Sequence, residues 1–98
     1  MNPLLAAVTE KEWQAQVEQL ARLNRWRVYH PWTSIRSAEG FPDLTLVRPP
    51  RLVFLELKRE SGKVRIAQEG WLADLAACGH VARVARPSDW DSLVALLT

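Results

Sequence analysis

Two apolar runs, "LTLV" (44–47) and "LVFL" (52–55), are separated by a short segment that contains Pro49-Pro50. Short apolar runs bounded by turn residues are typical of buried β-strands. A reversal at the two prolines makes the runs a hairpin that pairs residues whose numbers sum to 99. Proline cannot adopt the positive φ of a two-residue primed turn, so we expect a four-residue loop over 48–51.

This register brings three charged residues together. Asp43 falls opposite Glu56, and directly opposed residues share one face of a sheet, with Cβ atoms roughly 4.5–5.5 Å apart. Strand alternation adds Lys58 to that face, while the apolar residues 53, 55 and 57 point to the other side. Two carboxylates so close repel each other unless a cation lies between them.

Two hard oxygen ligands with room for water suit Mg²⁺ or Mn²⁺. A divalent ion held there could lower the pKa of a bound water and polarise a phosphoryl oxygen. Lys58 could position the attacking water or neutralise charge on the phosphorus. The alternative is a surface salt-bridge cluster at a strand end. The Gly-Phe-Pro sequence before Asp43 and the placement of Lys58 favour the metal site.

The rest of the chain predicts further helices and strands. Apolar residues recur at helical spacing over 9–24, where Thr9 and Glu12 form a capping box. In chain order the other elements are a strand in "WRVYHPW", an irregular loop in "TSIRSAEG", a helix in "VRIAQEGWLADLAAC" stopped by Gly79, a strand in "HVARVA" and a closing helix capped by Ser88. We expect an α/β sandwich around one sheet, with parallel strands in its β-α-β unit.

A length of 98 residues indicates one domain. We expect an N-terminal tail over 1–8 and a single domain over 9–98. No run approaches the ~18 apolar residues of a membrane span, and the N-terminus lacks a basic signal-peptide region. The single cysteine, Cys78, excludes an internal disulfide and a cysteine-rich zinc site, and we expect it to be a small core residue. A reducing cytosolic compartment fits this composition.

The formal charge of +2 is too small to identify a polyanionic partner. Its distribution is more informative, because residues 48–65 contain six basic side chains against two acidic ones. A solvated strand edge protected by charges and a phosphate-binding surface explain this excess equally well.

The motif "PD" at 42–43, followed by "ELK" at 56–58, resembles the signature of the PD-(D/E)XK nucleases. The helix with "TEKEWQ", the "GFPDL" and "ELK" motifs and a Gln in the following helix are similar to the VRR-NUC branch of that superfamily. Its members are small stand-alone domains common in phages and domains fused to larger repair nucleases. The resemblance covers nearly the whole chain and implies a restriction-endonuclease-like αβββαβ sandwich, followed here by a C-terminal helix.

The resemblance also implies roles for individual residues. Asp43 and Glu56 match the metal ligands of the family, with the backbone carbonyl of Leu57 as a further ligand. Lys58 matches the catalytic lysine, and Gln68 matches a glutamine that supports the site.

The first helix of this family carries a glutamate that faces the metal-bound water, and Glu10 and Glu12 both qualify. Glu12 is engaged in the predicted capping box, whereas Glu10 lies four residues before Gln14 on one helical face. We therefore favour Glu10. His30 precedes Pro31 and is expected to be a strand-end histidine rather than a general base.

The function implied is that of a divalent-metal-dependent DNA endonuclease that hydrolyses phosphodiester bonds, selects junctions, flaps or nicks, and uses Mg²⁺ or Mn²⁺. Beside the site, the side chains expected to contact phosphates are Arg36, Arg59, Lys63 and Arg65. We expect a homodimer, since one metal site cuts one strand, in the cytoplasm of a bacterial or phage-infected cell. The competing hypotheses are a non-catalytic nucleic-acid-binding module with the nuclease fold, and a structural α/β domain with a surface ion cluster.

Overall fold

The computed structural model describes residues 3–31 and 38–98, so the predicted phosphate contact Arg36 lies outside the described residues. The elements in chain order are α1 (Pro3–Ala6), α2 (Glu10–Leu23), β1 (Arg27–Tyr29), β2 (Leu44–Arg48), β3 (Arg51–Leu57), α3 (Ile66–Ala77), β4 (Val81–Ala85), the 3₁₀ helix η1 (Pro87–Asp89) and α4 (Trp90–Leu97). The described strands form one sheet in the order β1-β2-β3-β4. The prediction of a mixed α/β fold is confirmed.

The hairpin β2–β3 has the predicted register, with partners that run from Arg48↔Arg51 to Leu44↔Leu55. The β-α-β unit is also as predicted, because β4 pairs parallel to β3 after the crossover through α3. The four-residue loop is wrong, since Arg48 and Arg51 pair across the turn and leave only Pro49-Pro50 between them. That peptide bond is cis, the geometry of a type VI turn, which needs no positive φ.

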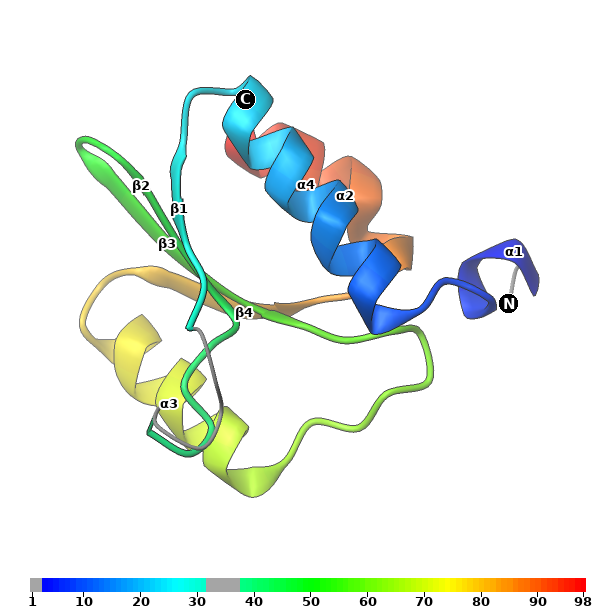
Figure 1. The fold of residues 1–98 in the computed structure, drawn as a ribbon. Coiled ribbons are helices and arrows are strands. Elements are labelled where there is room, and N and C mark those ends of the chain that lie inside the picture. Colours follow the sequence, from blue (N-terminus) through cyan, green and yellow to red (C-terminus); the bar gives the residue numbers. More distant parts are fainter. Residues whose placement is uncertain (1–2, 32–37) are drawn as a thin grey trace.

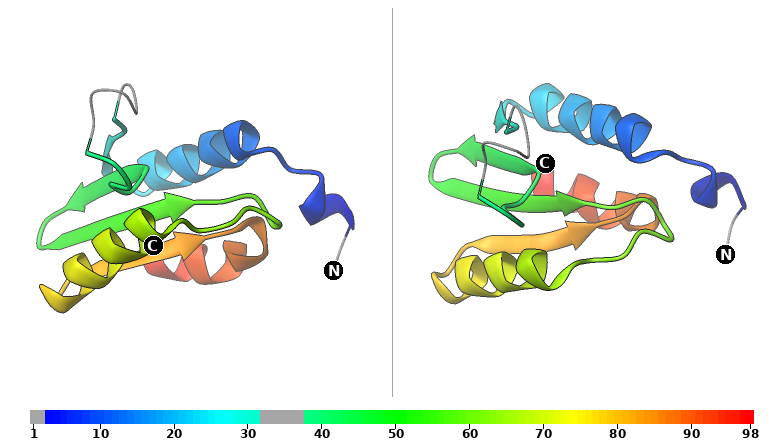
Figure 2. Two further views of the ribbon diagram at one scale, coloured as in Figure 1. Left: turned by 90° about the horizontal axis from the view of Figure 1, so that it is seen from below. Right: turned by 60° about the horizontal axis from the view of Figure 1, so that its bottom comes forward.

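The helices cover both faces of the sheet, with α2 and α4 on one face and α3 on the other (Figures 1 and 2). On the α2/α4 face, Trp13 and Val17 of α2 and Leu93 and Leu97 of α4 pack on Leu44, Leu46, Val53, Leu55 and Leu57. On the α3 face, Phe41 makes edge contacts with Phe54 and with Trp71 of α3. The alternation of β3 therefore sends its odd residues to the larger core and turns Glu56 toward α3.

The short helix α1 projects from the body of the protein, away from the sheet (Figure 1). None of the four residues Pro3–Ala6 is buried.

The helix α2 begins as predicted, with the Thr9 hydroxyl accepting a hydrogen bond from the Glu12 N–H and the Glu12 carboxylate accepting one from the Thr9 N–H. The Thr9 hydroxyl also donates to the Glu12 carboxylate at 2.8 Å, and this hydrogen bond, followed by the one from the Thr9 N–H, lowers the pKa of Glu12.

The carbonyl of Ala85, at the end of β4, connects three elements. It accepts the Trp13 indole N–H of α2 at 2.9 Å and the Lys58 backbone N–H at 3.1 Å. A buried tryptophan needs a partner for its N–H group, and here that partner is the same carbonyl that holds the residue directly after β3. The position of Lys58 is thus linked to the packing of α2.

The sequence suggested that the basic residues near the hairpin turn either protect a solvated strand edge or bind phosphates. Arg48 and Arg51 do neither. Arg48 donates to the carbonyls of Asn24, Leu97 and Thr98, and Arg51 donates to that of Leu96. Their guanidinium carbons also lie 4.7 and 5.0 Å from the centroid of the Trp26 ring. Both cations therefore satisfy terminal carbonyls of α4, where a helix end carries partial negative charge. This use removes two cations from the proposed phosphate-binding surface.

The closing helix starts differently from the prediction. The cap of the 3₁₀ turn that leads into α4 is made by Asp89, whose Oδ2 accepts the Arg86 N–H at 2.8 Å. The predicted cap Ser88 instead donates its own N–H to Glu60 Oε1 at 2.6 Å. The 3₁₀ turn moves the capping position, and the partner of Ser88 comes from a loop 28 residues earlier.

The helix α3 ends at the predicted stop, Gly79, which has a φ of +91°. Cys78 just before it is exposed, so the prediction that it is a core residue is wrong. Gly79 and Pro50 line one small hollow. The C-terminal end of α3 therefore lies beside the hairpin turn, at the end of the sheet opposite Leu57.

Gly40 brings the segment before β2 into close contact with the backbone of α3. Its φ is +82°, and a Cβ atom added there would lie 2.5 Å from the backbone carbonyl carbon of Ala67. Only glycine fits such a position, because any other residue is strained at this φ and would collide with backbone. The first residue of the "GFPD" motif thus fixes the distance between Asp43 and the first turn of α3.

We predict that Gly40→Ala lowers the free energy of unfolding by about 2 kcal/mol or more, from left-handed strain and overpacking together. For a domain of this size the melting temperature should fall by about 8 °C or more. The matched control is Gly70→Ala in the middle of α3, where an added Cβ meets nothing within 4 Å. That control should gain about 0.5–1 kcal/mol. Equal melting temperatures for the two variants would contradict the packing argument.

Candidate active site

A cavity of about 220 Å³ brings together most of the site residues that the sequence singled out. Its walls are formed by Glu10, Gln14, Asp43, Glu56, Leu57, Lys58, Arg65 and Gln68. These residues come from α2, from the segment before β2, from the end of β3 and from the start of α3. The cavity therefore lies where the carboxyl end of a central strand meets two helices, a usual place for a site in an open α/β sheet.

Some of the predicted residues lie outside this cavity. Arg59 and Lys63 are exposed on the loop between β3 and α3. Glu12 is exposed and engaged with Thr9, whereas Glu10 lines the cavity. Of the two glutamates that the resemblance left open, the geometry thus brings Glu10 to the other site residues.

Asp43 is held in place through its backbone and its side chain. The Leu57 N–H donates to Asp43 Oδ2 at 2.8 Å, which connects the end of β3 to the residue before β2. His30 Nδ1 lies 3.0 Å from the carbonyl oxygen of Asp43, and since a carbonyl can only accept, this ring nitrogen is the donor. Sequence reasoning missed this contact. No pattern of residue types indicated it, because its acceptor is a backbone carbonyl.

Glu56 is a buried carboxylate with an incomplete set of partners. Its residue is 2% exposed. Gln68 Nε2 donates to Oε2 at 2.7 Å, and the ammonium of Lys58 lies 3.8 Å from the same oxygen. Within the described part of the chain, the buried Oε1 atom has no hydrogen-bond partner. A buried acceptor without a donor is costly, so an unpaired oxygen of this kind calls for a proton or a cation.

The electrostatics of the acidic pair point the same way. Burial raises the pKa of Glu56 to about 8, with a further contribution from the Asp43 carboxylate and a partial offset from Lys58. Most of Glu56 is therefore protonated at neutral pH in the metal-free protein, because burial penalises its ionised form and the neighbouring Asp43 carboxylate adds to that penalty. A bound cation would oppose this shift by stabilising the ionised form.

The orientation of the Gln68 amide follows from its two partners. The Arg65 N–H donates to Gln68 Oε1 at 2.9 Å, so the Nε2 group must face Glu56. A side chain whose oxygen caps the first turn of α3 thereby presents a neutral donor to the buried carboxylate. This hydrogen bond supports Glu56 through its Oε2 atom and leaves its Oε1 atom without a partner among the described residues.

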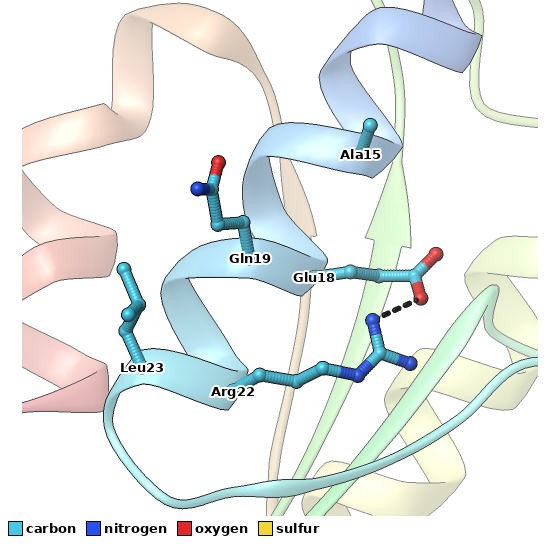
Figure 3. A pocket seen from close by; sticks show the side chains of 5 residues that line it. All are labelled: Ala15, Glu18, Gln19, Arg22 and Leu23. Atoms are coloured by element: carbon cyan, nitrogen blue, oxygen red, sulfur yellow. Dashed lines mark hydrogen bonds and ion pairs between the residues drawn. The ribbon is translucent and has the colours of Figure 1, made fainter.

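A larger hollow, of about 540 Å³, lies on the outward face of α2 and is lined by Ala15, Glu18, Gln19, Arg22 and Leu23 (Figure 3). Arg22 Nη1 donates to Glu18 Oε1 at 3.1 Å across it. An ion pair of this i,i+4 type is an ordinary feature of a solvated helix face. The residues that suit bond-breaking chemistry are in the smaller cavity.

Fold and cavity together define a small α/β domain with an acidic pair and a lysine of the kind used in phosphodiester chemistry. The sequence model of the VRR-NUC domain matches residues 6–89, and the chain belongs to this family. The resemblance drawn from the sequence is thereby confirmed, and the family gives the chain a nuclease-type function with nucleic acid as the implied substrate. No curated protein and no solved structure matches the chain.

No helix within residues 3–31 and 38–98 has the length and apolar character that a membrane span requires.

Proposed function

We propose that the chain is a divalent-metal-dependent DNA endonuclease that hydrolyses phosphodiester bonds. The observation that carries this proposal is the buried Glu56 Oε1, which has no hydrogen-bond partner among the described residues, in a carboxylate that shares its cavity with Asp43 and Lys58. A binding-only domain has no use for an acidic pair that resists ionisation. A divalent cation offsets the repulsion between two carboxylates, and its binding releases the proton that Glu56 otherwise holds.

The residues fit Mg²⁺ or Mn²⁺. Asp43, Glu56 and the carbonyl of Leu57 would hold the ion, and these are the hard oxygen donors that both cations prefer. Within residues 3–31 and 38–98, no group of three or more His, Cys, Asp or Glu side chains is arranged to hold a metal ion by itself. Mg²⁺ tolerates so few protein ligands because it keeps several waters and accepts substrate phosphate oxygens. When bound, the ion supplies an activated water and polarises the phosphoryl group.

The side chains around the acidic pair would prepare the substrate for hydrolysis. The Lys58 ammonium, 11% exposed at its side chain and 3.8 Å from Glu56 Oε2, would orient the attacking water and offset the charge that develops on the phosphoryl oxygens. Gln68 would hold Glu56 in one orientation through its donated hydrogen bond. Glu10, which lines the cavity from the first turn of α2, would accept a hydrogen bond from the water.

The surroundings of the cavity suit a polyanion. Arg65 lines its rim, and Arg59 and Lys63 are exposed on the adjacent loop; all three would contact phosphates. The element order supports the αβββαβ core of the PD-(D/E)XK nucleases, followed by α4. One cavity of this size acts on one strand, so we propose a homodimer for paired cuts at junctions, flaps or nicks. A cytoplasmic location and a part in phage or repair DNA processing complete the proposal.

The test is cleavage of four-way junction, flap, nicked and linear DNA in Mg²⁺, in Mn²⁺ and in EDTA. We expect cleavage in either metal, none in EDTA, and none with Asp43→Ala or Lys58→Ala. Unchanged cleavage by both variants would overturn the proposal. DNA binding that EDTA does not affect, with no cleavage under any condition, would favour the non-catalytic binding module instead.

A further inference from the structure

Arg86, directly after β4, makes an unusual set of contacts with the loop of residues 58–65, named here the β3–α3 loop. Its Nη1 atom donates to the carbonyl oxygens of Arg59 at 2.8 Å, Glu60 at 3.1 Å and Gly62 at 2.7 Å. One guanidinium nitrogen carries two hydrogens, which are here shared among three carbonyls. That nitrogen therefore has no hydrogen left for a phosphate.

Further hydrogen bonds join the same two segments. The Ser88 N–H donates to Glu60 Oε1 at 2.6 Å, and the Lys58 N–H donates to the Ala85 carbonyl at 3.1 Å. Within the loop, the Gly62 N–H donates to the Arg59 carbonyl at 3.0 Å. The end of β4 and the segment after it thus hold the β3–α3 loop from Lys58 to Gly62, although 24 to 28 residues separate the partners.

These contacts give the loop an inner and an outer side of different charge. Three carbonyl oxygens, the negative ends of their peptide dipoles, point inward to the guanidinium of Arg86. The side chains of Arg59 and Lys63 are exposed. Without Arg86 the carbonyls would have to turn to water, and oxygen atoms on the outer side would repel a phosphate backbone.

We propose that Arg86 is a positioning residue for DNA binding, which acts by holding the β3–α3 loop so that Arg59 and Lys63 face the phosphates on either side of the scissile bond. The proposal rests on the proposed nuclease function and adds to it. Arg86 itself makes no contact with DNA in this scheme. Its guanidinium neutralises the inner side of the loop, and the outer side supplies the cations.

The salt dependence of DNA binding distinguishes a positioning role of Arg86 from a merely structural one, because a structural role would leave this dependence unchanged. Each phosphate contact made by Lys or Arg contributes about 0.9 to the slope of log Kd against log salt concentration on duplex DNA. The probe is a fluorescein-labelled four-way junction, measured by anisotropy in EDTA at several NaCl concentrations. The variants are Arg86→Gln, the double variant Arg59→Ala/Lys63→Ala, and the triple variant that combines them.

We expect the slope to fall by about 1.8 in the double variant and by about 0.9 to 1.8 in Arg86→Gln. The triple variant should have the slope of the double variant, because Arg86 acts only through the two residues that are already lost. The control is Arg22→Gln, which removes one charge from the outward face of α2 (Figure 3) and should keep the wild-type slope. Mn²⁺ binding, measured by calorimetry, should be unchanged in Arg86→Gln.

An unchanged slope in Arg86→Gln, or a further fall in the triple variant, overturns the proposal, since the second result would mean that Arg86 contacts DNA itself. If Arg86→Gln does not fold, Arg86→Lys replaces it in the same cycle. That variant should lose part of the slope in the wild-type background and none in the double variant.

The failure of this inference can be distinguished from the failure of the proposed function. A wild-type chain that neither cuts nor binds the junction overturns the nuclease function as well. Wild-type cleavage together with an unchanged salt slope in the Arg86 variants overturns this inference alone.

Discussion

Lys58→Met should lower kcat for DNA cleavage by about 10²- to 10⁴-fold, the range for a group that transfers or stabilises charge in the transition state. Methionine keeps the length and apolar stem of a side chain that is only 11% exposed, so the cavity should stay filled. The protonated state of Glu56 removes the need for a neighbouring cation, and the variant should therefore fold. Single-turnover cleavage in saturating Mn²⁺ measures the effect.

Two comparisons make this prediction specific to the ammonium of Lys58. Lys11→Met removes the same charge from the exposed first turn of α2 and should leave the rate unchanged. Lys58→Arg should be nearly as slow as Lys58→Met, because a planar guanidinium is larger than the compact ammonium and cannot place its charge at the same point. A Lys58→Met enzyme within about threefold of the wild-type rate would rule out this role for Lys58.

Glu56→Gln should abolish metal-dependent cleavage and at the same time make the metal-free protein more stable at alkaline pH. An amide at position 56 can accept the hydrogen bond from Gln68 and donate one toward the Asp43 carboxylate. It has no charge to bury, and so it avoids the cost that raises the pKa of Glu56 to about 8. Replacing a catalytic group with a residue that suits the folded state is a common cause of such a trade-off between stability and activity.

The sign of the pH dependence follows from this pKa. The ordinary value for Glu56 is 4.5, and in the folded protein the value is about 8. Between these values the folded protein binds a proton that the unfolded chain has lost, so the free energy of unfolding in EDTA falls as pH rises through this window. The loss is complete above the folded-state pKa. Glu56→Gln should not show this fall, and its advantage should therefore grow from pH 5 to pH 9.

Melting curves in EDTA and in Mg²⁺ test both parts of the prediction. A difference of about 1 kcal/mol corresponds to about 4–8 °C for a domain of this size, and we expect at least the lower figure at pH 9. Mg²⁺ at about 100 times its Kd should add about 2.7 kcal/mol to the wild type and nothing to Glu56→Gln. A stability difference that is independent of both pH and Mg²⁺ would contradict the burial argument.

The sequence predicts the hairpin and its acidic pair well, because both depend on local rules. Alternation along a strand and a turn at Pro49-Pro50 determine which residues lie opposite each other, and the register summing to 99 is confirmed. A capping box needs only two residues three positions apart, and Thr9 with Glu12 meets that rule. These features involve neighbours in sequence or a single reversal of the chain.

The features that sequence reasoning missed are hydrogen bonds between distant segments. Arg48 and Arg86 resemble any exposed arginine in the sequence, yet each binds carbonyls at least 24 residues away. Backbone carbonyls occur at every position, so a side chain that binds them leaves no pattern of residue types. The hydrogen bond from His30 to the Asp43 carbonyl escaped prediction for the same reason.

The far end of α3 offers a practical advantage for such experiments. Cys78 is the single cysteine of the chain and is exposed beside Gly79, near the Pro-Pro turn. The helix α3 has 12 residues, and at 1.5 Å per residue it separates this thiol from Gln68 by well over ~10 Å. A maleimide dye or a surface tether attached to Cys78 would therefore leave the acidic cavity open, with no engineered cysteine required.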